Sequence, residues 1–298
     1  MLIGVLGFGV HVLLPQVGSM QQGFQALRSG RWLYLSVAIA GSVLVFVASA
    51  WMVHASVSPS PSWGRTIAVQ IGAGFSSTVT PAGVGWFAVT QSFLQRAGTP
   101  HDEAQAATGL NLVLTILAHI GLLLVLLPFL PTLDLPAVTA PNSRIVLDIA
   151  VVAAVLVGVV LWMPATRRRT VAAVVPVLQT VPRVLSDPSR SLQMVAAAIA
   201  QNLAYALTLL GSVYAFGASA PPLGVLVVYL LAATVASVSP TPGGLGPMEM
   251  ALVAGLSRLA IPGGEAVAAA LTFRLLTFWL PMPLGALVLG RSRRNGWI

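Results

Sequence analysis

Long stretches of the chain contain no charged side chain, and short segments that hold the charges separate them. The charge-free stretches are residues 32–63, 66–95, 104–133 and 191–248. Because about 20 apolar residues in a helix cross a hydrocarbon core about 30 Å thick while hydrogen-bonding their own backbone, these stretches predict membrane-spanning helices. We expect helices near residues 2–19, 33–55, 65–79, 104–127, 145–163, 192–216, 222–238 and 266–290.

The overall composition supports the same interpretation. Only 7% of the residues are charged, 57% are hydrophobic and the mean hydropathy is +0.91, whereas soluble domains carry about 25% charged residues. A soluble protein is therefore excluded. We expect an all-α integral membrane protein of about eight transmembrane helices, with residues 1–298 forming a single membrane domain.

The charge and the polar residue types exclude several other classes. The net charge of +8 comes from arginine alone, with clusters at 167–169 and 291–294 that suit cytoplasmic loops beside anionic lipid. Basic groups at span ends do not predict a nucleic-acid partner. The chain has no cysteine, and its four histidines lack metal-ligand spacing, so we expect neither a disulfide, a metal nor a cofactor. No zinc-protease, nucleophile-elbow or P-loop motif occurs, which argues against an enzyme.

An internal repeat divides the chain into two similar halves. The sequence T-P-A-G-V-G at residues 80–85 matches T-P-G-G-L-G at 241–246, an offset of 241 − 80 = 161 residues. Each copy precedes a short helix of about a dozen residues, a proline, a Glu-Ala pair and a long apolar span. We expect homologous halves at about 1–141 and 142–298, with a basic linker at 164–190.

Counting the spans makes a prediction for these loops. If both arginine clusters are cytoplasmic, an even number of crossings separates them, yet only three clear spans lie between. Either one cluster is outside, or the segment from Pro240 to Ala260 makes a net crossing by dipping into the membrane as half-helices. Broken, re-entrant helices at matching places in two repeats are typical of transporter binding sites.

Two charged residues in otherwise apolar segments are the first site candidates. Pro247 can occupy the first position of a helix, which would place the Glu249 carboxylate beside unpaired backbone N–H groups. Arg274 lies about 12 Å into the last span and is the obvious partner. A helix cap and a buried ion pair that fixes packing would explain both residues. A guanidinium that meets a lipid phosphate, with the acid as its partner, would explain them equally.

The remaining candidates shape the loops or join the helices. We expect the broken loops to contribute Thr80, Pro81, Gly83, Gly85, Thr241, Pro242, Gly243, Gly244 and Gly246 to a substrate-binding or gating site with Glu249 and Arg274. Other polar side chains within the spans are expected to form interhelical hydrogen bonds, and these are Gln70, Gln91, Asn111, His119, Gln201, Asn202 and Tyr205.

The second loop also carries a family resemblance. P-x-P-G-G-L-G-x-x-E at Pro240–Glu249, followed by Arg274 in the final span, resembles the membrane region of the lysylphosphatidylglycerol synthase family, which is uncharacterised-protein family 0104. That family also looks related to an archaeal membrane protein once described as a dolichol-linked glycosyltransferase. The resemblance implies a flippase-like fold of eight spans at the plasma membrane.

Two departures from the family pattern limit what is carried over. Charged residues usually follow the glycines of the first loop in this family, whereas this chain has W-F-A-V-T at 86–90. An anionic or amino-acylated headgroup is therefore not specified as the substrate. Only eight residues follow Gly290, so we expect no soluble lysyl-transferring domain.

Three functions remain open from the sequence. The first is a flippase or lipid transporter whose partner is a membrane lipid. The second is an integral membrane glycosyltransferase, or an accessory subunit of cell-envelope glycolipid synthesis, with Glu249 as its acid. The third is a scaffold that transports nothing, in which the loop glycines matter for stability alone. A homo-oligomer or an envelope-biosynthesis partner is compatible with each of them.

Overall fold

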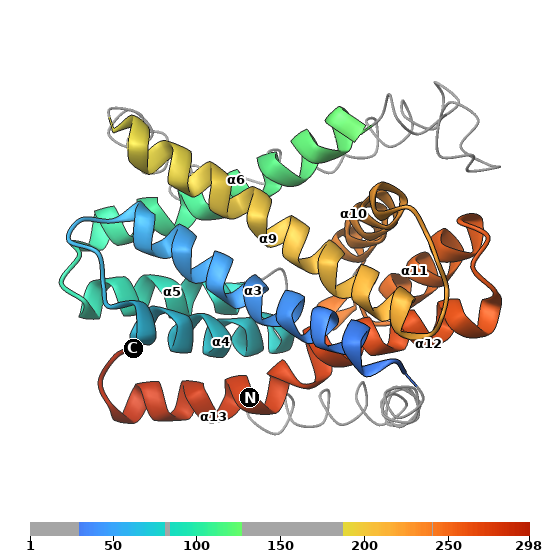
Figure 1. The fold of residues 1–298 in the computed structure, drawn as a ribbon. Coiled ribbons are helices and arrows are strands. Elements are labelled where there is room, and N and C mark those ends of the chain that lie inside the picture. The colour runs from blue at the N-terminus through green and yellow to red at the C-terminus, as the bar shows by residue number, and fades with distance from the viewer. Residues whose placement is uncertain (1–29, 81–83, 127–186, 240) are drawn as a thin grey trace, which may run out of the picture.

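The computed structural model describes residues 30–80, 84–126, 187–239 and 241–298, and all regular structure in them is helical (Figure 1). The helices are α3 (Trp32–Ser56), α4 (Trp63–Val79), α5 (Val84–Arg96), α6 (His101–Leu126), α9 (Pro188–Ala215), α10 (Pro222–Val238), α11 (Pro247–Arg258), α12 (Gly263–Arg274) and α13 (Pro281–Arg294). A short 3-10 turn, η4 (Pro242–Gly244), precedes α11, and a π-helical segment, η5 (Leu275–Trp279), joins α12 to α13.

The helices predicted within the described residues are present, with ends shifted by a few residues. The all-helical fold is thus confirmed. The predicted helices 2–19 and 145–163 lie outside the described residues, as does the linker up to residue 186. At the end of the linker, the Asp187 carboxylate accepts hydrogen bonds from the backbone N–H groups of Ser189 and Arg190 at 3.1 and 3.2 Å, which caps α9.

Four of the described helical stretches are long and apolar enough to cross a membrane. They are α3, α6, α9 and the 32-residue stretch from Gly263 to Arg294, in which η5 connects α12 and α13. The predicted spans 65–79 and 222–238 are helical, but α4 and α10 have 17 residues each. At 1.5 Å per residue such a helix is about 25 Å long, shorter than a typical hydrocarbon core.

Two of the long helices, α3 and α9, form an antiparallel pair at the centre. The backbone N–H of Arg31, just before α3, donates to the carbonyl of Ala215 at the end of α9 at 2.8 Å. Glycines allow the close approach: a Cβ on Gly211 would stand 2.6 Å from the backbone nitrogen of Ala38, and one on Gly41 would stand 2.7 Å from the Thr208 hydroxyl. Small residues at such crossings are typical of membrane helices.

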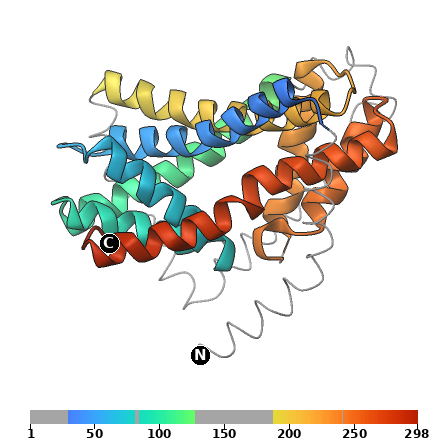
Figure 2. The same cartoon turned by 60° about the horizontal axis from the view of Figure 1, so that its bottom comes forward.

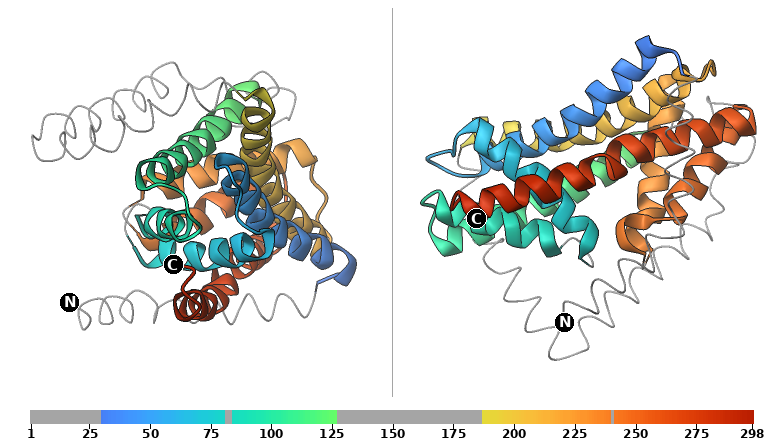
Figure 3. Two further views of the ribbon diagram at one scale, coloured as in Figure 1. Left: turned by 90° about the vertical axis from the view of Figure 1, so that its left-hand side faces the viewer. Right: turned by 90° about the horizontal axis from the view of Figure 1, so that it is seen from below.

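The shorter helices form two hairpins at opposite ends of the long helices (Figures 1 and 3). We call the end that holds Trp297 the C-terminal end; α4 begins there, where Arg65 lies against the Trp297 ring, and α5 ends there. The α10–α11 hairpin begins and ends at the opposite end, where Gly224 of α10 packs against Leu259 after α11. Each hairpin turns at one of the repeated loops.

The hairpin geometry shows how the chain runs through the second loop. Because α11 returns to the end at which α10 began, α10 and the segment from Pro240 to Ala260 together make no net passage along the bundle. Only α9 and the α12–α13 stretch run the full length between the linker and the C-terminal arginines (Figure 2). Their number is even, as two cytoplasmic arginine clusters would require, because α10 is half of a hairpin and is not a third crossing.

The order of helix lengths from α4 to α6 is similar to the order from α10 to α13. A 17-residue helix, a loop and a helix of 13 or 12 residues occur in both, followed by a long helix of 26 or 32 residues. This order is the one that a repeat would produce. The homology of the halves and their boundaries stay predictions.

Proline causes the break in the last long helix. Pro281 has no N–H to donate to the preceding turn, and the Leu280 N–H donates to the carbonyl of Leu275, five residues back, at 2.8 Å. The Ser42 hydroxyl of α3 donates to the Leu276 carbonyl at 2.8 Å, which satisfies a backbone group at this irregular turn. The break lies between the 12 residues of α12 and the 14 of α13, near the middle of the stretch.

Candidate functional site

The second repeated loop depends on glycines with left-handed backbone angles. The φ angles of Gly243, Gly244 and Gly246 are +61°, +64° and +90°. Gly243 also lies against a side chain, because a Cβ there would stand 2.2 Å from the Phe278 ring. Residues with a Cβ rarely adopt these angles, so the G-G-L-G sequence is what permits this tight turn after α10.

Glu249 caps the helix that follows the loop, as predicted. Pro247 is the first residue of α11, and one Glu249 carboxylate oxygen accepts a hydrogen bond from the Gly246 N–H at 2.7 Å. The missing N–H of proline costs nothing at this position, and the positive end of the helix favours the acid. The sequence therefore places a carboxylate at the tip of the α10–α11 hairpin.

Arg274 is the partner of this carboxylate. Its Nε donates to the other Glu249 oxygen at 2.7 Å, and its Nη2 donates to the Gly243 carbonyl at 3.0 Å. The guanidinium also lies over the Phe278 ring, 4.4 Å from the centroid. The side chains of Arg274 and Glu249 are 8% and 22% exposed, so the acid is the more accessible member of a largely buried ion pair.

An aromatic wall from three helices lies beside the ion pair. Tyr205 of α9 and Tyr229 of α10 stack with ring centroids 5.5 Å apart, and Phe273 of α12 lies 6.4 and 6.1 Å from them. Tyr205 lies near the Arg274 guanidinium. The sequence predicts an interhelical hydrogen bond for Tyr205 and nothing in it marks Tyr229, Phe273 or Phe278.

The first repeated loop is held by neutral hydrogen bonds. The Thr80 hydroxyl donates to the Ser76 carbonyl at 2.7 Å and accepts from the Gly85 N–H at 2.8 Å. Gly85 must be glycine because a Cβ would stand 2.2 Å from the Ser76 carbonyl oxygen. In both loops a polar side chain thus accepts a hydrogen bond from a backbone N–H at the start of the returning helix. The acceptor is a hydroxyl in the first loop and a carboxylate in the second.

A buried glutamine joins this hairpin to α3. Gln70 accepts hydrogen bonds from Ser49 and Trp86, each at 2.9 Å, and donates to Thr90 at 3.3 Å. Gln70 is 1% exposed and Thr90 is 0% exposed. The prediction of interhelical hydrogen bonds is confirmed here. It is also confirmed for Asn111, which donates to Ser56, and for His119, which bridges Asn202 and Thr234.

The two hairpins approach each other near the break in the last long helix. Residues of α4 contact η4 of the second loop. Along α13, Gly285 packs against Phe75 of α4 and Leu289 packs against Gly72, so the end of α4 points toward the start of α13. Both loops are therefore near η5, halfway along the bundle.

The structure brings some of the predicted site residues together and leaves others apart. Glu249, Arg274, Gly243 and Gly246 are in direct contact, and Gly244 packs under them against Ala236. The Thr241 hydroxyl forms a 2.8 Å hydrogen bond with the Ser239 hydroxyl, and Pro242 begins η4. Thr80 and Gly85 form hydrogen bonds within the first loop, and among the described residues no hydrogen bond joins either of them to the ion pair. Pro81 and Gly83 lie outside the described residues.

These features define a helical membrane protein with a buried ion pair at a loop between two half-length helices. The family model of the lysylphosphatidylglycerol synthase TM region matches residues 1–285 of the chain. The chain belongs to this family, as the loop motif predicted.

A relative supports the same assignment over a shorter stretch. A "UPF0104 membrane protein" of Methanothermobacter thermautotrophicus is 36% identical over 73 residues. The match covers 24% of this chain and 22% of the relative. Membership of this family is consistent with a lipid-related function in a membrane.

Proposed function

We propose that the protein is a flippase-like, multi-pass protein of the plasma membrane that binds a lipid headgroup at Glu249 and Arg274 and moves it between leaflets. The observation that carries this proposal is the largely buried ion pair at the broken loop, halfway along the bundle. Charges at membrane depth are costly, and they commonly mark substrate pathways. Broken helices at that depth are the usual place of transporter binding sites.

The geometry of Arg274 suits a phosphate. A guanidinium has five N–H donors, and hydrogen bonds to Glu249 and Gly243 occupy two of them among the described residues. A phosphate oxygen can be met by the others, and planar guanidinium donors suit phosphate geometry. When a headgroup binds, Glu249 can release Arg274 and keep its bond to the Gly246 N–H, so neither charge needs to be left without a partner.

The hairpins suggest how a headgroup could pass. They enter from opposite ends and approach each other near η5, so each would shield one half of the path. Loop backbone that is not in a regular helix offers N–H and C=O groups where lipid tails offer none. A headgroup crossing there would exchange water for loop backbone and Arg274 in the middle of its passage.

A catalytic role for Glu249 in a glycosyltransferase has less support. Both carboxylate oxygens already accept hydrogen bonds, from Gly246 and from Arg274. This arrangement favours a residue that holds the loop over one that takes a proton from a sugar acceptor. Sugar transfer by the purified protein that is lost in Glu249→Gln would reverse this preference.

Lipid translocation in proteoliposomes tests the proposal. Headgroup-labelled phospholipids are placed in both leaflets, and a membrane-impermeant quencher is added outside. With wild-type protein we expect quenching to extend to inner-leaflet lipid, and with the double variant Glu249→Gln/Arg274→Gln we expect it to stop at the outer leaflet. The double variant is preferred to either single one because it leaves no unpaired charge in the bundle.

The chain offers a matched control for this assay. Asp187 and Arg190 form an ion pair at 3.2 Å with side chains 47% and 36% exposed. Asp187→Asn/Arg190→Gln removes the same two charges at the surface and should translocate lipid like wild type. Translocation at the wild-type rate by Glu249→Gln/Arg274→Gln would contradict the assignment of those side chains. Translocation no faster in wild-type vesicles than in empty ones, across several headgroups, would contradict the flippase function itself.

A further inference from the structure

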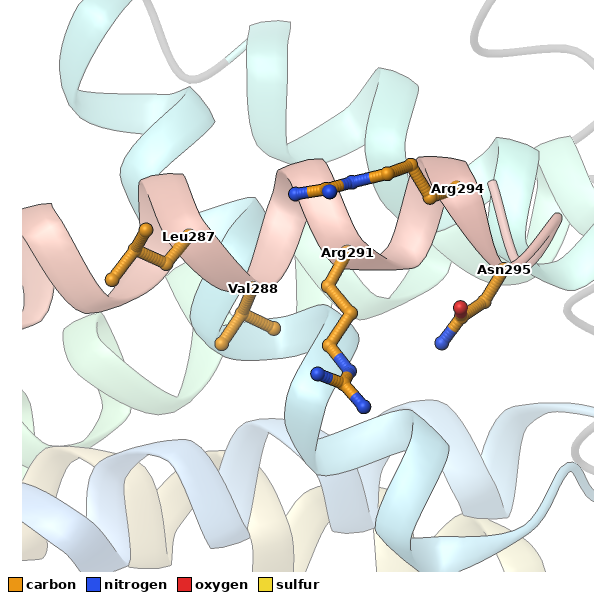
Figure 4. A pocket seen from close by; sticks show the side chains of 5 residues that line it. All are labelled: Leu287, Val288, Arg291, Arg294 and Asn295. Atoms are coloured by element: carbon orange, nitrogen blue, oxygen red, sulfur yellow. The ribbon is translucent and has the colours of Figure 1, made fainter.

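The last turns of α13 form a pocket with one apolar side and one basic side. Its lining consists of Leu287, Val288, Arg291, Arg294 and Asn295 (Figure 4). Val288, Arg291 and Asn295 point to one side of the helix, while the Arg294 side chain lies back along it. Among the residues that the structure describes, no acidic side chain lines the pocket. It therefore combines two guanidinium groups, an amide and an aliphatic floor at one end of a long apolar helix.

The helix end that carries this pocket is anchored. After α13 the chain folds back, and the Trp297 N–H donates to the Ser292 carbonyl at 2.9 Å. Trp297 and Ile298 pack against the buried cluster that includes Leu289, and Arg65 lies over the Trp297 ring at 5.6 Å from the centroid. Ser292 is 1% exposed, so the opposite face of the turn is fixed inside the protein. The backbone that carries the lining side chains is therefore held in place.

The basic side chains of the pocket are available to a ligand. Arg291 and Arg294 are exposed, and within the described part of the chain neither forms an ion pair with an acid. The exposed Leu284 and Leu287, at 57% and 72%, precede them at helical spacing on the same side of α13. An exposed apolar stripe that ends in arginines is what a helix presents where lipid tails give way to headgroups.

We infer that this pocket binds the phosphate of an anionic phospholipid, at a site separate from Glu249 and Arg274. The guanidinium groups of Arg291 and Arg294 donate to the phosphodiester, the Asn295 amide donates to the headgroup, and an acyl chain lies along Leu287 and Leu284. Arginines that merely stabilise the negative end of a helix would be indifferent to lipid charge. A pocket without an acid, lined by two arginines, distinguishes phosphatidylglycerol from phosphatidylcholine.

Native mass spectrometry of the full-length protein in detergent tests the inference. Phosphatidylglycerol and phosphatidylcholine are titrated separately onto wild type, Arg291→Gln/Arg294→Gln and the control Arg31→Gln/Arg258→Gln, which removes two arginines at the opposite end. Each basic residue near an anionic surface contributes about a fivefold factor in affinity. The phosphatidylglycerol affinity of Arg291→Gln/Arg294→Gln should therefore fall by roughly twentyfold to thirtyfold, with phosphatidylcholine binding and the affinity of the control unchanged.

The other outcomes are equally decisive. Equal binding of the two lipids to wild type, or an equal loss in the control variant, would overturn the inference. A competition arm with inorganic phosphate separates a lipid from a free anion: complete displacement of phosphatidylglycerol by millimolar phosphate would show an ion site and no lipid site. Arg291→Lys/Arg294→Lys should keep part of the selectivity, and its failure to do so while still folded would also contradict a charge-based site.

Discussion

Arg274 and Glu249 stabilise the folded protein as a pair. Removing one partner of a buried ion pair leaves an uncompensated charge and costs about 3–5 kcal/mol, whereas neutralising both is far milder. We expect Arg274→Gln and Glu249→Gln each to lower the unfolding temperature in detergent, and the double variant to be more stable than Arg274→Gln. Tryptophan fluorescence during heating measures all three. Additive losses in the double variant would mean that the two side chains do not interact in the folded protein.

Gly243 is predicted to be the glycine of the second loop that is least tolerant of substitution. Its φ of +61° and its contact with Phe278 both oppose a Cβ. A left-handed residue costs about 1–2 kcal/mol, and the steric clash adds to it, so Gly243→Ala should lower the unfolding temperature. Gly121→Ala is the matched control, since nothing lies within 4 Å of a Cβ there. Equal stability of the two variants would contradict the loop geometry.

The sequence located the charged members of the site, but not the uncharged ones. Glu249 and Arg274 stood out because each is a rare charge in a long apolar stretch, and their pairing followed from the need of a buried charge for a partner. Tyr229, Phe273 and Phe278 are aromatic residues in helices where aromatic residues are ordinary. Nothing in their spacing indicates which of them faces the guanidinium, because that depends on how four helices pack.

At the scale of helices, the glycine contacts between α3 and α9 determine how close the central pair can come. A Cβ at Gly211 or Gly41 would overlap the partner helix, so Gly211→Ala and Gly41→Ala should push α3 and α9 apart. Overpacking of this kind costs about 1–3 kcal/mol. Each variant should unfold at a lower temperature than wild type in the same detergent. A stability equal to that of Gly121→Ala would show that the helices adapt without loss.

The sequence predicted which residues are helical more reliably than the course of each helix through the bundle. Apolar runs marked α4 and α10 as helices, and the Pro-Gly loops indicated re-entrant structure. The return of α11 to the end where α10 began could not be read from hydropathy, because α11 is short and its apolar face is weak in sequence. Contacts between the two helices of the hairpin decide it, such as Val228 of α10 against Gly255 of α11.

At the scale of the whole molecule, the arginines predict an orientation. Of the nine arginines in the described ranges, six (65, 96, 190, 291, 293 and 294) lie at the C-terminal end, and two (31 and 258) lie at the opposite end. Arginine-rich ends face the cytoplasm. The loop that contains Ser60 should therefore be cytoplasmic, and the loop that contains Ser219 should be on the other side of the membrane.

The absence of native cysteines makes this orientation easy to test. Ser60→Cys and Ser219→Cys place single thiols at exposed positions at opposite ends. In intact cells a membrane-impermeant maleimide should label Ser219→Cys and leave Ser60→Cys unlabelled until the membrane is opened. Labelling of Ser60→Cys alone in intact cells would reverse the orientation, and labelling of both would contradict the arrangement of the hairpins.

The π-helical turn at η5 sets the rotational phase of the whole C-terminal helix. Successive residues of an α-helix are about 100° apart around the axis, so a turn closed by a five-residue bond contains one residue more than the regular ladder and rotates everything after it by about that angle. Gly285 meets Phe75, and Leu289 meets Gly72, only in this phase. A deletion of one residue in 275–279 would shorten the helix by a single step, yet it would turn those contacts, and the arginines beyond them, toward different neighbours.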